Sequence, residues 1–139
     1  MELSSFQLGN MQLVEIKYKI NENFISENPE LSLEMNAKST VQRVEGLSQA
    51  KVILKLSVFN EENFISVPFF IEVVMQGVFT WKENLSEEKA NALLNTNGPA
   101  ILMGYARPFI TQFTSYSGYP PLILPLMDFT KNQVSEDRC

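Results

Sequence analysis

Histidine is absent from this sequence of 139 residues, and the single cysteine is the last residue, Cys139. The commonest acid–base group at neutral pH, which is also the commonest metal ligand, is therefore missing. The sequence also contains no glycine-rich phosphate loop and no cluster of metal-ligating residues. The paired carboxylates Glu61–Glu62 and Glu87–Glu88 are expected at a turn and at a helix start, both solvated positions. We therefore predict a protein that is not an enzyme and needs no metal or cofactor.

Long uninterrupted apolar runs are missing as well. The longest apolar stretch, residues 64–79, is broken by Pro68, Glu72 and Gln76. It is shorter than the roughly 20 residues that a membrane-spanning helix needs. The first ten residues lack the basic start and apolar run of a signal peptide. A single terminal cysteine allows no internal disulfide, so we expect a cytoplasmic protein without direct membrane insertion.

Positive charge is in deficit, because 11 basic residues face 16 acidic ones and the net charge is -5. This balance argues against nucleic acid and anionic membranes, which attract basic surfaces, and it favours a partner of basic character. The charged fraction of 19% and the hydrophobic fraction of 45% are those of a folded globular chain. We expect one domain over residues 1–129 and a polar, flexible C-terminal tail over residues 130–139.

Alternation of apolar and polar residues predicts four strands. The first runs over 13–20, with Val14, Ile16, Tyr18 and Ile20 on one face. The second runs from 31 towards 44, the third over 50–59 and the fourth over 64–81. In the fourth, Ile65 is expected on the inward face. The connections are short, which favours an antiparallel sheet.

Helical spacing replaces this alternation after residue 85. Ser86 is suited to cap a helix that ends near Gly98, and Pro99 is suited to begin a second helix, which Pro108 should kink. The predicted fold class is therefore α+β, with a four-stranded antiparallel sheet and a kinked long helical segment packed on one face. Arg107 has no evident partner in the sequence, although a carboxylate at the helix interface would suit it.

The four residues of 23–26, Asn-Phe-Ile-Ser, recur at 63–66. The echo is too short to indicate a repeat architecture, so turn chemistry is the simpler explanation.

Residues 98–107, Gly-Pro-Ala-Ile-Leu-Met-Gly-Tyr-Ala-Arg, resemble a pattern of the SecB export-chaperone family. Ile110-Thr111, Tyr119-Pro120 and the run 122–129 follow in step with that pattern. The stretch 69–79 is similar to the family's fourth strand. The resemblance therefore covers most of the chain.

This resemblance implies a sheet with long helices on one side, pairing through an edge strand, and stacking into a dimer of dimers. It implies apolar grooves that take unfolded preproteins and an acidic sheet face that takes the export motor SecA, with no cofactor. The SecA-like face would carry Phe70 and Glu72. The client-binding residues would be Phe24, Ile25, Tyr119, Leu122, Leu124 and Met127. Packing between subunits would use Ile101, Tyr105, Ile110 and Phe113.

The sequence departs from the family pattern after Phe129, where a second amphipathic helix and a SecA-binding tail are expected. Three hypotheses follow. The first is a SecB-like holdase for unfolded polypeptides. The second is an adaptor of the same fold for a single protein partner, such as an antitoxin. The third, a small-molecule binding domain, is the weakest because no convergent polar groups are evident. A dimer and a tetramer both remain open.

Overall fold

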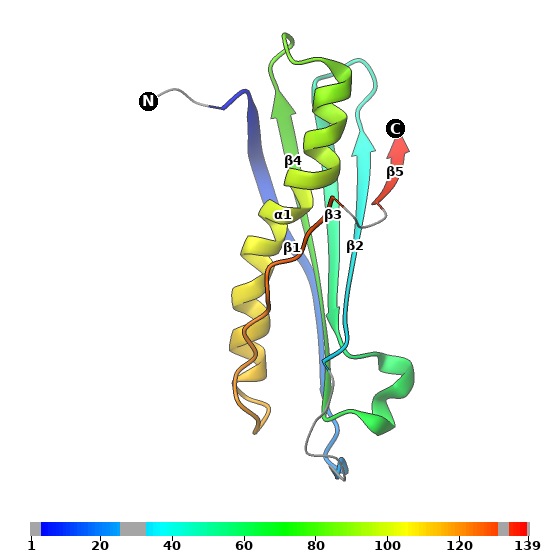
Figure 1. The fold of residues 1–139 in the computed structure, drawn as a ribbon, viewed down its shortest axis with the longest axis vertical. Helices are drawn as coiled ribbons and strands as arrows, with labels where there is room; N and C mark the ends of the chain where they lie inside the picture. The colour runs from blue at the N-terminus through cyan, green and yellow to red at the C-terminus, as the bar shows by residue number, and fades with distance from the viewer. Residues whose placement is uncertain (1–3, 26–32, 131–133, 139) are drawn as a thin grey trace.

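The chain folds into a sheet that is covered on one face by a long helix (Figure 1). The computed structural model describes residues 4–25, 33–130 and 134–138. The elements in chain order are β1 (Phe6–Ile20), β2 (Met35–Arg43), β3 (Gln49–Val58), the short 3-10 helix η1 (Glu61–Ser66), β4 (Phe69–Trp81), α1 (Glu87–Thr114) and β5 (Val134–Arg138). The strand order is β1-β4-β3-β2-β5.

The four predicted strands are β1 to β4, and each neighbouring pair among them is antiparallel. The predicted fold class is confirmed. Where we predicted only a polar tail, the structure adds β5, which pairs in parallel with residues 39–43 of β2. This pairing covers backbone groups that β2 would otherwise present as the edge of the sheet.

The register of β1 differs from the predicted alternation because the strand has irregularities between Leu8 and Met11 and between Leu13 and Glu15. An extra residue in a bulge moves the following side chains to the other face. Ile16 and Tyr18 pack against the core as predicted, whereas Val14 and Ile20 are 53% and 36% exposed.

The predicted fourth strand begins later than expected, at Phe69, because η1 precedes it. The Asn60 side chain caps η1 by accepting a hydrogen bond from the Glu62 amide at 3.0 Å. Ile65 therefore leaves the predicted inward row and is 89% exposed.

One helix replaces the two that were predicted, since α1 continues through Pro99 and Pro108. Ser86 is its N-cap, as expected, and accepts a hydrogen bond from the Lys89 amide at 3.2 Å. The helix continues through Pro99 where it lies very close to the sheet: a Cβ on Gly98 would be 3.2 Å from Val52. Close packing compensates for the hydrogen bond that proline removes. Among the described residues, no helix is long and apolar enough to cross a membrane.

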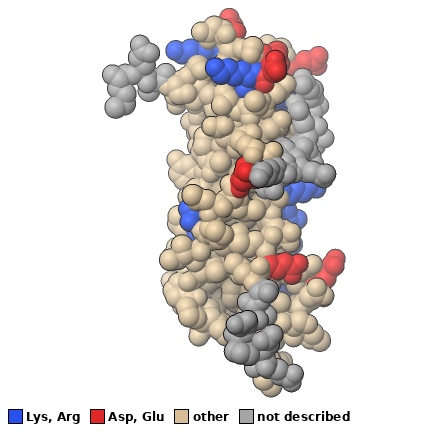
Figure 2. Space-filling model, in the orientation of Figure 1, with Lys and Arg blue, Asp and Glu red and all other residues tan. Residues whose placement is uncertain are grey.

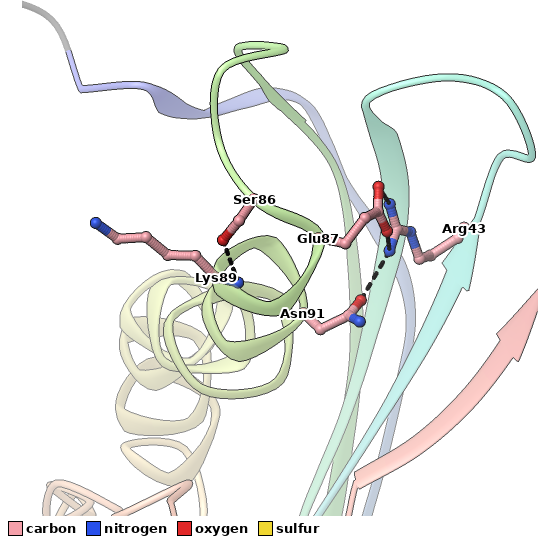
Figure 3. Close-up of polar contacts among 5 residues, drawn as sticks. All are labelled: Arg43, Ser86, Glu87, Lys89 and Asn91. Carbon is pink, nitrogen blue, oxygen red and sulfur yellow. Dashed lines mark hydrogen bonds and ion pairs between the residues drawn. The ribbon is translucent and has the colours of Figure 1, made fainter.

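The start of α1 is fixed to the sheet by Arg43 of β2, which is only 5% exposed (Figure 3). Its guanidinium donates to both carboxylate oxygens of Glu87, at 2.6 and 3.2 Å, and to Asn91 at 2.8 Å. The same group lies 5.1 Å from the Trp81 ring centroid. A bidentate pair with an aromatic neighbour fixes the direction in which α1 leaves the sheet.

Candidate functional site

After α1 the chain turns and runs back beside the helix in extended form (Figure 1). We call residues 119–129 the return segment. Three side chains of α1 bind its backbone. Arg107 donates to the Leu124 carbonyl, with Nε at 3.1 Å and Nη2 closer still. Thr111 donates to the Leu122 carbonyl at 2.8 Å, and the Leu122 amide donates to Thr114 at 2.9 Å. The expected carboxylate partner of Arg107 is thus replaced by a main-chain carbonyl.

These bonds divide the side chains of the return segment into two rows. The inner row packs into the core, with Leu124 1% exposed and Phe129 4% exposed. Leu122 and Met127 are half-buried against the same core. The outer row faces solvent, with Ile123 76% exposed and Leu126 85% exposed.

An open groove of about 400 Å³ lies between the second half of α1 and the return segment. Figure 2 looks onto this side of the molecule and shows few charged side chains over these two elements. The sequence from 119 to 127 contains no charged residue at all. The groove is lined by Gly104, Arg107, Pro108, Thr111, Gln112, Ile123 and Leu124. Because its walls are largely apolar or formed by backbone, the groove is suited to an extended apolar chain.

The predicted client-binding residues fall into three environments. Leu124 is in the core, and Leu122 and Met127 are packed against it. Tyr119 remains available at 42% exposure. Phe24 and Ile25 lie on a different segment, after β1, where Phe24 is half-buried and Ile25 is 81% exposed.

The four residues of α1 that were predicted to pack between subunits also divide. Ile101 and Tyr105 are 37% and 48% exposed, so both can meet another chain. Ile110 is fully buried in this chain's own core. Phe113 packs edge-on against Tyr18, with ring centroids 5.7 Å apart. Burial raises the pKa of the Tyr18 hydroxyl.

Phe70 and Glu72 do share the outer face of β4, away from α1, but the Phe70 ring is buried at 3% exposure. The Glu72 carboxylate lies 3.5 Å from the Lys55 ammonium, with 12% of its side chain exposed. Both residues line a shallow pocket of about 260 Å³ beside Glu61 and Glu62 of η1. A partner at this face would therefore meet carboxylates, with Phe70 as part of the pocket floor.

Sequence reasoning missed Ile123 and Leu126, the most exposed aliphatic residues of the return segment. A signal was available for Ile123 alone, because an extended segment places successive side chains on opposite sides, whereas the exposure of Leu126 breaks that alternation. Once Leu122 and Leu124 are inward, Ile123 must be outward. Ile65 was missed because η1 was interpreted as part of a strand.

A protein-family model described as preprotein translocase subunit SecB matches residues 14–134. The protein-export protein SecB of Anaplasma phagocytophilum is 35% identical over 111 residues, covering 73% of this chain and 70% of that protein. The SecB of Anaplasma marginale strain Florida is 30% identical over 114 residues, covering 78% and 65%. This chain thus spans about two thirds of the length of these relatives.

Among solved structures, a SecB-like chaperone of Mycobacterium tuberculosis, in complex with an antitoxin peptide, has a TM-score of 0.66 at 16% identity. The match covers 89% of this chain and 88% of that one. At this identity the likeness establishes the fold.

Proposed function

The chain belongs to the SecB family, and from this premise we propose that it is a holdase, a chaperone that binds unfolded polypeptides without catalysing a reaction. The observation that carries the proposal is the outer row of the return segment. Ile123 and Leu126 are 76% and 85% exposed on a stretch without charge, beside an open groove. Contiguous exposed apolar surface of this kind is a mark of interaction sites.

The way the return segment is held suits this task. A holdase must accept many sequences, so it needs broad apolar contacts in place of a tailored pocket. Because Arg107, Thr111 and Thr114 bind the backbone of the segment, its outer side chains stay available to a client. Each contact is weak, but several such grooves on one oligomer would hold a long client by avidity.

We propose unfolded preproteins as the clients and the cytoplasm as the place of action. The net charge of -5 favours clients with basic segments. SecA remains a proposed partner for the outer face, where Glu72 lines a pocket with two further carboxylates. An adaptor or antitoxin-type chaperone for a single partner is the alternative that the experiment below separates.

We also propose that copies of the chain associate through the exposed side of α1. Ile101 and Tyr105 lie one helical turn apart and are partly exposed, so they form one apolar row. A homodimer or a tetramer would cover this row. Analytical ultracentrifugation of Tyr105→Glu against the unchanged protein measures the change, and an unaltered mass would exclude this interface.

The test of the holdase is light scattering of a chemically unfolded, aggregation-prone protein diluted into buffer with and without this chain. We expect suppression near one oligomer per client, and its loss in the double variant Ile123→Ser with Leu126→Ser. The matched control is Leu47→Ser, which changes a leucine that is 57% exposed on the turn between β2 and β3.

Three results would contradict the proposal in different ways. Failure of the folded, unchanged protein to suppress aggregation of several unrelated clients would exclude a general holdase. Capture of one specific partner in that case would establish the adaptor. Equal loss of activity in Leu47→Ser and in the double variant would remove the return segment as the site.

A further inference from the structure

The two Asn-Phe-Ile-Ser copies, at 23–26 and 63–66, begin at the same end of the sheet, although 40 positions separate them (Figure 1). Asn21 joins them. Its side-chain amide donates to the carbonyls of Phe64, Ile65 and Val67 at 2.9, 3.3 and 3.0 Å. The main-chain carbonyl of Asn21 accepts a hydrogen bond from the Phe24 amide at 3.2 Å. We call residues 21–25 together with η1 the Asn21 tip.

The phenylalanine and the isoleucine of each copy have opposite environments. Phe24 and Phe64 are half-buried, and Phe64 packs against the core. Ile25 and Ile65 are 81% and 89% exposed, among the most exposed aliphatic residues in the part of the chain that the structure describes. In each copy the phenylalanine is thus partly covered, whereas the isoleucine is left in water. A single exposed isoleucine is ordinary. Two exposed isoleucines on segments that Asn21 joins by hydrogen bonds are not explained by core packing.

The surroundings of the tip are acidic. Glu22, Glu61 and Glu62 are all exposed on the same two segments. Lys19 is committed locally, because its ammonium lies 2.8 Å from the Glu61 carboxylate and 5.9 Å from the Phe64 ring centroid. Two carboxylates therefore stay without a balancing cation on the tip itself. Exposed isoleucines on the same tip as exposed carboxylates complement an apolar segment flanked by lysine or arginine.

The tip lies at the end of the molecule where the return segment begins (Figure 1). Tyr18, close to the end of β1, contacts Phe113, close to the end of α1, so the last turn of the helix lies at the same end of the molecule as the start of the tip. The return segment starts from that end of α1. The return segment and the Asn21 tip thus begin at the same end of the molecule (Figure 1).

We propose that the Asn21 tip is a second client contact, at which Ile25 and Ile65 take an apolar residue of an extended polypeptide and Glu22 and Glu62 take its flanking basic residues. This proposal rests on the proposed holdase function and assigns to the turn between β3 and β4 a role that the family resemblance did not. Ile65 is its distinctive residue. The shape of the turn is enforced at its entry, where Phe59 has a φ of +63°.

The experiment records isoleucine methyl NMR spectra of the full chain, with Ile25, Ile65 and Ile123 assigned through valine substitutions. The probe is a short unfolded peptide with an apolar centre and lysine flanks, and its matched control carries glutamate in place of lysine. We expect the Ile25 and Ile65 signals to move with the lysine peptide and much less with the glutamate peptide. Ile25→Ser with Ile65→Ser should weaken binding of a long unfolded client about tenfold, whereas Leu47→Ser should not.

The outcomes separate this proposal from the holdase itself. If Ile123 responds to the peptide while Ile65 does not, the tip is excluded and the holdase stands. If the Ile65 signal moves with protein concentration and not with peptide, the tip is a contact between copies and the proposal is wrong. If neither Ile123 nor the scattering assay responds, the holdase fails, whatever Ile65 does.

Discussion

The outer face of the sheet and the return segment both bring aliphatic residues near solvent, but they surround them differently. On the sheet, Val74 is half-buried beside Lys55 and Glu72, whose charged groups are 3.5 Å apart. A further ion pair, Lys19–Glu61, lies at the end of the same face. On the return segment no charged side chain occurs between 119 and 127, and the outer row is open to water.

The difference shows on which of the two surfaces the apolar side chains are already covered in the free chain. Long lysine side chains can cover the apolar residues of the sheet while their ammonium groups stay hydrated. The return segment has no such cover, although its backbone is firmly bonded to α1. A contact surface needs a fixed backbone and exposed apolar side chains. We therefore expect substitutions in the two regions to have different consequences.

The largest expected effect sharpens this contrast within the return segment itself. Leu124→Ser should lower the free energy of unfolding by about 4 kcal/mol, because it leaves a cavity and buries a hydroxyl in the core. Leu126→Ser should change it by less than about 0.5 kcal/mol, because that side chain is 85% exposed. Urea unfolding followed by circular dichroism measures both. Similar losses in the two variants would show that the rows are not distinct.

A smaller effect is expected where the return segment is attached to α1. Arg107→Leu removes the bonds to the Leu124 carbonyl and should cost about 2 kcal/mol, felt mainly as local opening. Hydrogen exchange at the Leu122 amide reports that opening, because this amide bonds to Thr114 in the same attachment. Arg107→Lys keeps the charge without the fork and serves as the control. Unchanged protection in Arg107→Leu would mean that side-chain packing alone holds the segment.

Much of the fold could be predicted because alternation is a direct record of burial in an antiparallel sheet. The inward row of β3, from Val52 to Val58, is fully buried as predicted. The predictions failed where a local irregularity changed the period, at the bulges of β1 and at η1. Such events depend on a few local hydrogen bonds, such as the one from the Glu62 amide to the Asn60 side chain, which a periodic pattern does not record.

The candidate site could be predicted only in part, for a related reason. The family resemblance directed attention to residues 119–129, but it did not say which side chains of this segment face inward. The partner of Arg107 could not be found from sequence, because its partner is a main-chain carbonyl and every residue has one. The continuity of α1 through Pro99 was missed because propensity argues against it, while tertiary packing at Gly98 overrides it.

The smallest expected effect tests the outer face, through the pH dependence of the Lys19–Glu61 pair. A hydrogen bond from Lys19, supported by the positive charges of Lys19 and then Lys17, holds the pKa of Glu61 below its ordinary value. A carboxyl group with a lowered folded-state pKa stabilises the fold above its ordinary pKa of about 4.3, and this contribution is lost as the pH falls through the lower, folded-state value.

Glu61→Gln should therefore lower the urea midpoint slightly at pH 7 and make no difference well below pH 4. The effect is small because both side chains are about half exposed to solvent. Glu62→Gln is the matched control, since Glu62 forms no ion pair with any described residue. A Glu61 effect that is the same at both pH values would show that the charge of the pair contributes nothing. A large effect would mean instead that the sheet face depends on its ion pairs as strongly as the return segment depends on its inner row.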